Sequence, residues 1–301
     1  MRLALDWTPN TNHIGFFIAK ELGYFNENGL QIEILDPRED DYYLTPAKKL
    51  ELGKADLALC PTESILSYKT KDNPFEMVGI AAIYKEDLSA IAVKKSLKVC
   101  SPKNLDQRSY ASYNAKYEDK IVQKMIQNDG GKGDIKLVYP KKLGIWNTIV
   151  NDKYDATWIF VNWEGVQAND AELDLELFQL SDFGIPYSYS PVITVSNSSF
   201  VSNRTGYERF LKATKKGFLF AKENQKEAIE IFSKFVPKED DIDLAQSLNI
   251  SAVHFGSKED WGLMKPSVVN QFLSWLSNEG LEPRKFTFNE IMSNELLTNS
   301  N

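Results

Sequence analysis

Apolar residues recur along this chain in short continuous runs, separated by segments with apolar residues at helical spacing. In the first third, the runs predict strands at Leu3–Leu5, Ile32–Leu35, Leu57–Leu59 and Met77–Ile83. The segments between them predict helices at Gly15–Leu22, Pro46–Leu52 and Glu63–Lys69. This alternation predicts an α/β fold with a mostly parallel sheet and right-handed crossovers.

The middle of the chain repeats this rhythm at a smaller scale. It predicts strands at Tyr110–Ser112, Ile135–Tyr139, Ala156–Phe160 and Leu175–Leu180, and helices at Lys116–Gln127, Leu143–Val150 and Asn162–Asn169. We interpret the strand-like segments Ser89–Val93 and Val192–Val195 as two crossings between lobes, which predicts a hinge. The expected domains are therefore residues 1–93 with 194–301, and residues 94–193.

The last third of the chain is predicted to be helical and to cover the outer face of the first domain. The helical segments are Arg209–Glu223, Glu227–Phe235, Asp243–Leu248 and Val268–Leu276. Phe210 and Phe218 belong to an apolar stripe with near-helical period. Such a stripe is typical of core packing, and we do not interpret it as a cofactor site.

Polar and aromatic side chains gather where the predicted strands end, which is where open α/β sheets bind ligands. The first strand leads directly into Asp6-Trp7-Thr8-Pro9-Asn10-Thr11-Asn12-His13. We predict a ligand site that draws on Trp7, Asn10, His13, Asp36, Glu63, Tyr84, Asn114, Trp158, Asn162, Glu164 and Tyr187. Two of these have an equally simple structural explanation, because Glu63 fits the first turn of a helix and His13 fits a capping position.

Composition narrows the class of protein. The chain has 301 residues, which favours two domains, and 43% hydrophobic residues, enough for sizeable cores. Its net charge of −7, with both signs interspersed, argues against nucleic-acid partners. No apolar run approaches the length of a membrane span. Met1-Arg2 leads straight into a strand without a signal-peptide pattern, so we expect a cytoplasmic protein.

The residues for metal or nucleophilic chemistry are few. The chain has only two histidines, His13 and His254, and two cysteines, Cys60 and Cys100, which we expect to be free, buried thiols. We therefore predict no metal site and no Ser-His-Asp triad.

Three stretches carry a resemblance to a known family. They are the run LDWTPNTNHIGFFIAKELGYFNENGLQIEILDP, the junction Gly53-Lys54-Ala55-Asp56, and Asn162-Trp163-Glu164-Gly165. The run resembles the first βαβ unit of the type II periplasmic-binding-protein fold, and in particular the ThiY-like and thiamine-pyrimidine-synthase family. SsuA-like sulfonate binders are more distant relatives. The resemblance covers about residues 1–200 and implies a two-lobed fold that binds a thiamine precursor, a formylaminopyrimidine.

The chemistry of the candidate residues agrees with such a ligand. Aromatic faces stack on a flat heteroaromatic ring, and carboxylates and amides bind its amine and ring nitrogens. A sulfonate would instead favour arginine or a helix-end anion site, and Arg38 is the nearest candidate. An aminopyrimidine is therefore the preferred ligand.

The synthases of this family are the competing class, since the resemblance would imply a self-consuming enzyme with a pyridoxal phosphate lysine and a substrate histidine. Counted from Gly53, these two positions fall on Cys60 and Ser64. The family's cysteine-rich run would fall near residues 185–200, which contain no cysteine. We therefore expect a binder that closes two lobes on its ligand, with no catalytic residues and no cofactor.

Other interpretations stay open. The protein is predicted to be an intracellular carrier or sensor, and the alternatives are a diverged synthase or a transporter component whose signal peptide has been removed. The oligomeric state is open between a monomer and a homodimer.

Overall fold

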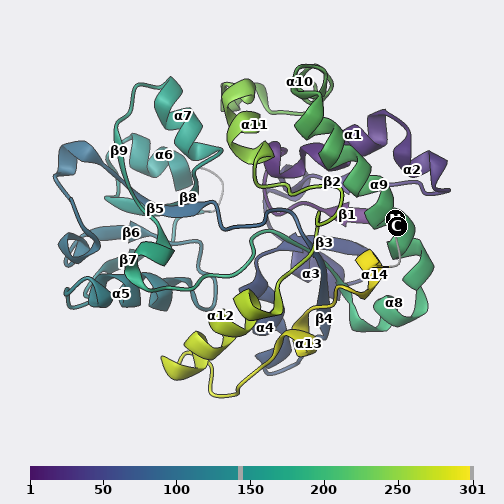
Figure 1. The fold of residues 1–301 in the computed structure, drawn as a ribbon. Coiled ribbons are helices and arrows are strands. Elements are labelled where there is room, and N and C mark those ends of the chain that lie inside the picture. Colours follow the sequence, from purple (N-terminus) through teal and green to yellow (C-terminus); the bar gives the residue numbers. More distant parts are fainter. Residues whose placement is uncertain (142–144, 299–301) are drawn as a thin grey trace. The chain divides into compact units, whose positions relative to one another are not determined.

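The predicted strands form two five-stranded mixed sheets in a computed structural model that describes residues 1–141 and 145–298 (Figure 1). The first sheet has the order β2-β1-β3-β10-β4 and the second β7-β6-β8-β5-β9. The strands of the first sheet are β1 Arg2–Ala4, β2 Glu33–Leu35, β3 Leu57–Cys60, β4 Met77–Ala82 and β10 Val192–Ser196. Those of the second are β5 Ser89–Lys94, β6 Ser109–Ala111, β7 Lys136–Val138, β8 Ala156–Phe160 and β9 Leu175–Phe178.

In the first sheet, the strands that lead into the candidate site all point the same way. β1 pairs in parallel with β2 and β3, with Leu3 opposite both Ile34 and Leu57. β10 runs antiparallel between β3 and β4, so β4 has the direction of β3. The carboxyl ends of β1, β2, β3 and β4 therefore share one edge of the sheet.

The second sheet has a similar arrangement of parallel and antiparallel strands. β6 pairs in parallel with β7 and β8, whereas β5 runs antiparallel to both β8 and β9. The carboxyl ends of β6, β7 and β8 therefore also share one edge.

The helices of the first unit pack on one another or on the first sheet. They are α1 Ile14–Glu21, α2 Tyr24–Glu27, α3 Pro46–Glu51, α4 Thr62–Thr70, α8 Asn197–Ser202, α9 Arg204–Glu223, α10 Gln225–Phe232, α11 Leu244–Ala252, α13 Phe288–Ile291 and α14 Glu295–Thr298. α9 lies beside α1, which is far from it in sequence (Figure 1). A Cβ atom at Gly217 would stand 2.0 Å from the carbonyl oxygen of Gly15, so only glycine allows this approach. Phe218 packs edge-on against Phe16 at 5.3 Å, which confirms that the aromatic stripe is core packing.

The second unit contains α5 Glu118–Asn128, α6 Ile145–Val150 and α7 Glu164–Asp170. Leu143, where the helix leading to Val150 was expected to begin, lies outside the described residues. Among the residues that the structure describes, no helix is both long enough and apolar enough to cross a membrane.

The division of the chain into compact units differs from the expected domain boundaries. One unit comprises Met1–Asp87, Ser188–Asn270 and the segment from Phe286 onward, and the other comprises Leu88–Tyr187 and Gln271–Lys285. β5 belongs to the second sheet because Ile91 pairs with both Trp158 and Phe178. The chain passes between the units at four places and not at two, because the second half of α12 Pro266–Asn278 belongs to the second unit. That helix was expected to lie entirely on the first domain.

Candidate functional site

Four predicted site residues lie at the carboxyl edge of the first sheet. Trp7, Asp36, Glu63 and Tyr84 each follow the last residue of β1, β2, β3 or β4 by no more than three positions. Glu63 is the second residue of α4 and its side chain is buried. This shared edge is the candidate site of the first unit.

His13 sets the conformation of the loop that carries Trp7. It ends the 3-10 turn η1 Thr11–His13, and its side chain is fully buried. The backbone N–H of Asn10 donates to His13 Nδ1 at 3.2 Å, so the ring proton is on Nε2, which donates to Asp6 Oδ1 at 2.7 Å. Both ring nitrogens are therefore used within the protein, and His13 acts as a positioning residue.

Asn10 and Tyr84 complete the frame of this loop. Asn10 caps η1, since its Oδ1 accepts from the backbone N–H of Asn12 at 2.8 Å. Tyr84, which stacks on Phe255, donates its hydroxyl proton to Asn12 Oδ1 at 2.7 Å. A chain of hydrogen bonds thus joins the end of β4 to the loop that follows β1, and brings Asn10, His13 and Tyr84 into one network.

Arg38, the nearest candidate for an anion ligand, is already paired. It lies in the 3-10 turn η2 Pro37–Asp40, whose cap is Asp36. The Arg38 guanidinium donates to Asp36 Oδ2 from two nitrogens, at 2.6 and 2.9 Å. This fork neutralises both groups, so the pair offers little to a sulfonate or phosphate.

The structure adds two residues that the sequence analysis missed. The Tyr42 ring lies 4.9 Å from the Trp7 indole, centroid to centroid. Asp240, at the end of the 3-10 turn η6 Lys238–Asp240, has a pKa raised to about 6 by burial and the charge of Glu239, against the opposing effect of Arg38. The sequence around these two residues does not distinguish them as site residues. Tyr42 is followed by a second tyrosine, Tyr43, and η6 is remote in sequence from the strands.

In the second unit, a buried carboxylate shapes the loop that carries Asn114. Glu118 accepts from the Tyr110 hydroxyl at 2.8 Å and from the backbone N–H groups of Tyr113 and Ala115 at 3.0 and 3.2 Å. Burial raises the pKa of Glu118 against these hydrogen bonds. Asn114 takes a left-handed conformation with φ of +60° and is exposed at the carboxyl end of β6.

The remaining predicted residues lie on and after β8. The Trp158 ring meets the Tyr187 ring edge-on at 5.1 Å. Asn162 is fully buried, and Glu164 begins α7, where its Oε2 accepts from the Phe160 backbone N–H at 3.0 Å. Trp158 and Tyr187 are therefore brought together, while Glu164 stabilises the turn at the strand end.

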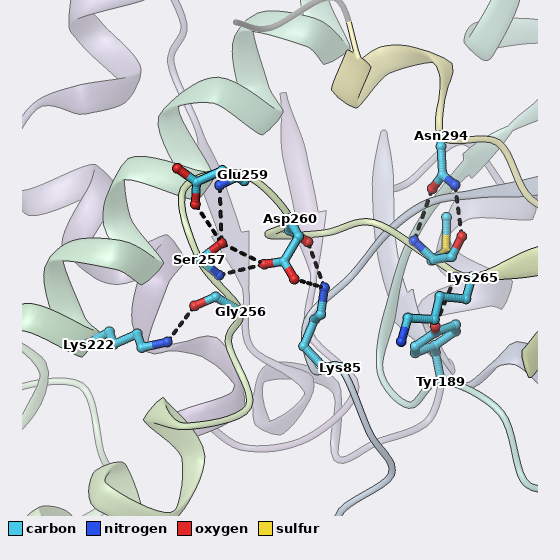
Figure 2. Close-up of polar contacts among 10 residues, drawn as sticks. Lys85, Tyr189, Lys222, Gly256, Ser257, Glu259, Asp260, Lys265 and Asn294 are labelled. Atoms are coloured by element: carbon cyan, nitrogen blue, oxygen red, sulfur yellow. Dashed lines mark hydrogen bonds and ion pairs between the residues drawn. The ribbon is translucent and has the colours of Figure 1, made fainter.

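The loop before α12 anchors two other segments of the first unit (Figure 2). Lys85, which follows β4, donates to Asp260 Oδ2 at 2.5 Å. The hydroxyl of Tyr189, which precedes β10, accepts from the backbone N–H of Lys265 at 2.9 Å. The hydrogen bond from Lys85 lowers the pKa of Asp260 to about 2, despite partial desolvation. One loop thus fixes both segments within the first unit.

The site residues do not fit the pyridoxal phosphate that the synthases would imply. Cys60, at the position of the lysine, has no amine; its thiol is buried beside Thr194 and its pKa is raised by burial to about 12. Within residues 1–141 and 145–298, no group of three or more His, Cys, Asp or Glu side chains could hold a metal. Both cysteines are free, but only Cys60 is buried, and the expectation that Cys100 is buried was wrong.

Two mixed sheets with polar and aromatic residues at their strand ends define a small-molecule-binding protein of the type II periplasmic-binding-protein fold. The periplasmic aliphatic sulphonate binding protein SsuA from Escherichia coli has this fold: its structure matches with a TM-score of 0.66 at 13% identity, covering 96% of this chain and 90% of that chain.

More narrowly, the chain belongs to the NMT1/THI5 like family, whose model matches residues 10–228. It is 26% identical over 235 residues to a formylaminopyrimidine-binding protein of Halalkalibacterium halodurans, covering 77% of this chain and 69% of that protein. It is 23% identical over 305 residues to a 4-amino-5-hydroxymethyl-2-methylpyrimidine phosphate synthase of Saccharomyces cerevisiae, covering 90% of this chain and 87% of the synthase. The predicted family is therefore confirmed.

Proposed function

We propose that this protein binds an aminopyrimidine of the kind found in thiamine precursors. The observation that carries the proposal is the chemistry of the first sheet's carboxyl edge. Trp7 and Tyr42 offer aromatic faces, Asp6 and Glu63 offer carboxylates, and Arg38 is neutralised by Asp36. Such an edge favours a flat ring with N–H donors over an anion.

The names of the relatives support the same ligand class. One is a formylaminopyrimidine-binding protein and another is a synthase whose product contains an aminopyrimidine. Between binder and synthase, we favour the binder, because Cys60 and Ser64 occupy the positions of the synthase lysine and histidine. The carrier or sensor role and the cytoplasmic location stay predictions.

We further propose that the ligand is captured by closure of the two units, because ligand binding favours whichever conformation offers more contacts. Small-angle scattering with and without 4-amino-5-hydroxymethyl-2-methylpyrimidine measures this closure. The radius of gyration should fall on binding, and an unchanged value at saturation would refute closure while leaving the binding assignment intact.

Calorimetric titration tests the ligand class. The probes are 4-amino-5-hydroxymethyl-2-methylpyrimidine, its formylaminopyrimidine relative and ethanesulfonate. Thermal unfolding gives a second readout: at a free concentration about 100 times its dissociation constant, a true ligand should add roughly 2.7 kcal/mol to the free energy of unfolding. Trp7→Ala should weaken aminopyrimidine binding about tenfold or more, since it removes a stacking face. The control is Tyr43→Ala, whose ring is 85% exposed. Binding of ethanesulfonate alone would overturn the proposal.

A further inference from the structure

Tyr42 is held in its position by an unusual backbone. Asp41 and Tyr42 both adopt left-handed conformations, with φ of +50° and +59°. Two successive non-glycine residues in this region cost about 1 kcal/mol or more each. The result is that Tyr42 turns inward and is only 9% exposed, while its neighbour Tyr43 is 85% exposed. The position of the Tyr42 ring against Trp7 is therefore associated with an unfavourable local backbone conformation.

Two hydroxyl groups in this corner are buried without a partner. Within the residues that the structure describes, neither Tyr42 Oη nor Thr8 Oγ1 has a hydrogen-bond partner. Thr8 is 7% exposed, so both side chains are about nine-tenths buried. A buried hydroxyl left unpaired costs about 1–3 kcal/mol, and native proteins keep few of them.

The surroundings of these hydroxyls are acidic. Thr8 Oγ1 is near enough to Tyr42 and to Asp240 to lower the pKa of both, although it forms no hydrogen bond of ordinary geometry with either. Asp36 also raises the pKa of Tyr42, but burial is the larger cause. The phenol is therefore protonated at neutral pH, and the nearby Asp240 carboxylate disfavours an anion or a carbonyl oxygen, while Asp36 is paired with Arg38.

We infer that Tyr42 and Thr8 form a subsite, beside the Trp7 indole, that accepts a hydrogen bond from the exocyclic amino group of the ligand. This inference rests on the proposed function and adds the residues that recognise the ligand's amino group by hydrogen bonding. Each hydroxyl oxygen can accept from an N–H group, while the carboxylate of Asp240 favours the positive end of that bond. The amino group of the ligand supplies the hydrogen-bond partner that these two hydroxyls lack among the described residues of the protein.

The test compares two probes and four variants by calorimetric titration. The probes are 4-amino-5-hydroxymethyl-2-methylpyrimidine and its 4-oxo analogue, which lacks the amino donor. Tyr42→Phe and Thr8→Val each remove one hydroxyl and keep the shape of the side chain. Thr8→Ser keeps the hydroxyl, and Tyr43→Phe changes an exposed neighbour.

The wild-type protein should prefer the amino probe. Tyr42→Phe and Thr8→Val should each weaken binding of the amino probe about 3- to 10-fold, with little effect on the oxo analogue. The controls Thr8→Ser and Tyr43→Phe should bind as wild type does. Tyr42→Phe and Thr8→Val should also melt at or above the wild-type temperature without ligand, because each removes an unpaired buried hydroxyl. A residue with only a structural role would not combine weaker binding with equal or higher stability.

Two results would overturn the inference, and they differ. If Tyr42→Phe and Thr8→Val keep both the affinity for the amino probe and the preference over the oxo analogue, the subsite is refuted and the proposed function stands. If the wild-type protein binds neither probe, the proposed function fails and the subsite fails with it.

Discussion

Replacing His13 with leucine should destabilise the first unit and weaken ligand binding at the same time. The imidazole is fully buried and joins two parts of the loop after β1: Nε2 donates to Asp6, and Nδ1 accepts from the backbone of Asn10. Trp7 lies between these two partners in the sequence. Loss of the ring therefore releases the segment that carries the stacking face.

The magnitude follows from the two hydrogen bonds. The bond to the Asp6 carboxylate, at 2.7 Å, is of the charged kind that contributes about 1.5–3 kcal/mol. The Asn10 N–H would be left unpaired in a buried position, at a cost of about 1–3 kcal/mol. Leucine fills much of the same volume, so the cavity contribution is small. We expect a loss of about 3–5 kcal/mol in the free energy of unfolding, a large share of ordinary domain stability.

Urea unfolding, followed by tryptophan fluorescence, measures this loss, and calorimetry measures binding. The control is His254→Gln, since His254 is the only other histidine and its side chain is 26% exposed, 3.7 Å from Glu86. The control should stay within about 0.5 kcal/mol of wild type.

With two histidines, the ring nitrogen resonances can be assigned by comparing the two variants. His13 should be protonated on Nε2. Protonation on Nδ1, or a stability loss below about 1 kcal/mol for His13→Leu, would refute the reasoning.

Three further predictions concern other parts of the protein. Native protein should react with one equivalent of a thiol reagent and unfolded protein with two. The reason is that Cys100 is exposed, while the buried Cys60 thiol has a pKa of about 12. Fast reaction of two equivalents in the native state would contradict this. Gly217→Ala should lower the free energy of unfolding by about 2 kcal/mol or more. Gly165→Ala should be neutral or stabilising, because the added Cβ would meet no atom closer than 3.6 Å. Equal effects of the two substitutions in urea unfolding would refute the packing argument. Asp240 has a folded-state pKa of about 6 against an ordinary 3.8, so the folded state favours its protonated form. Its favourable contribution to the free energy of unfolding is therefore complete below about pH 4 and is lost as the pH rises through 6. Asp240→Asn should flatten the pH dependence of stability in that window by up to about 3 kcal/mol.

The sequence alone determined which segments become strands and where the ligand-facing positions fall. Apolar runs and helical spacing are local patterns, so they located β3, β4 and β8 to within a residue or so. The end of a strand is also a local property. For this reason the hydrophobic pattern by itself places Trp7, Asp36, Glu63 and Tyr84 at strand ends, where a parallel arrangement gathers them at one sheet edge.

The tertiary structure decided which partner each segment and side chain has. β5 joined the second sheet because β8 and β9 flank it, and no local pattern specifies a pairing partner. His13 became a positioning residue through Asp6, and Cys100 proved exposed. Tyr42 and Tyr43 are identical in type, and only a left-handed backbone and a neighbouring indole determine which one turns inward. These outcomes depend on which groups the folded chain brings together, or on backbone conformations that composition does not encode.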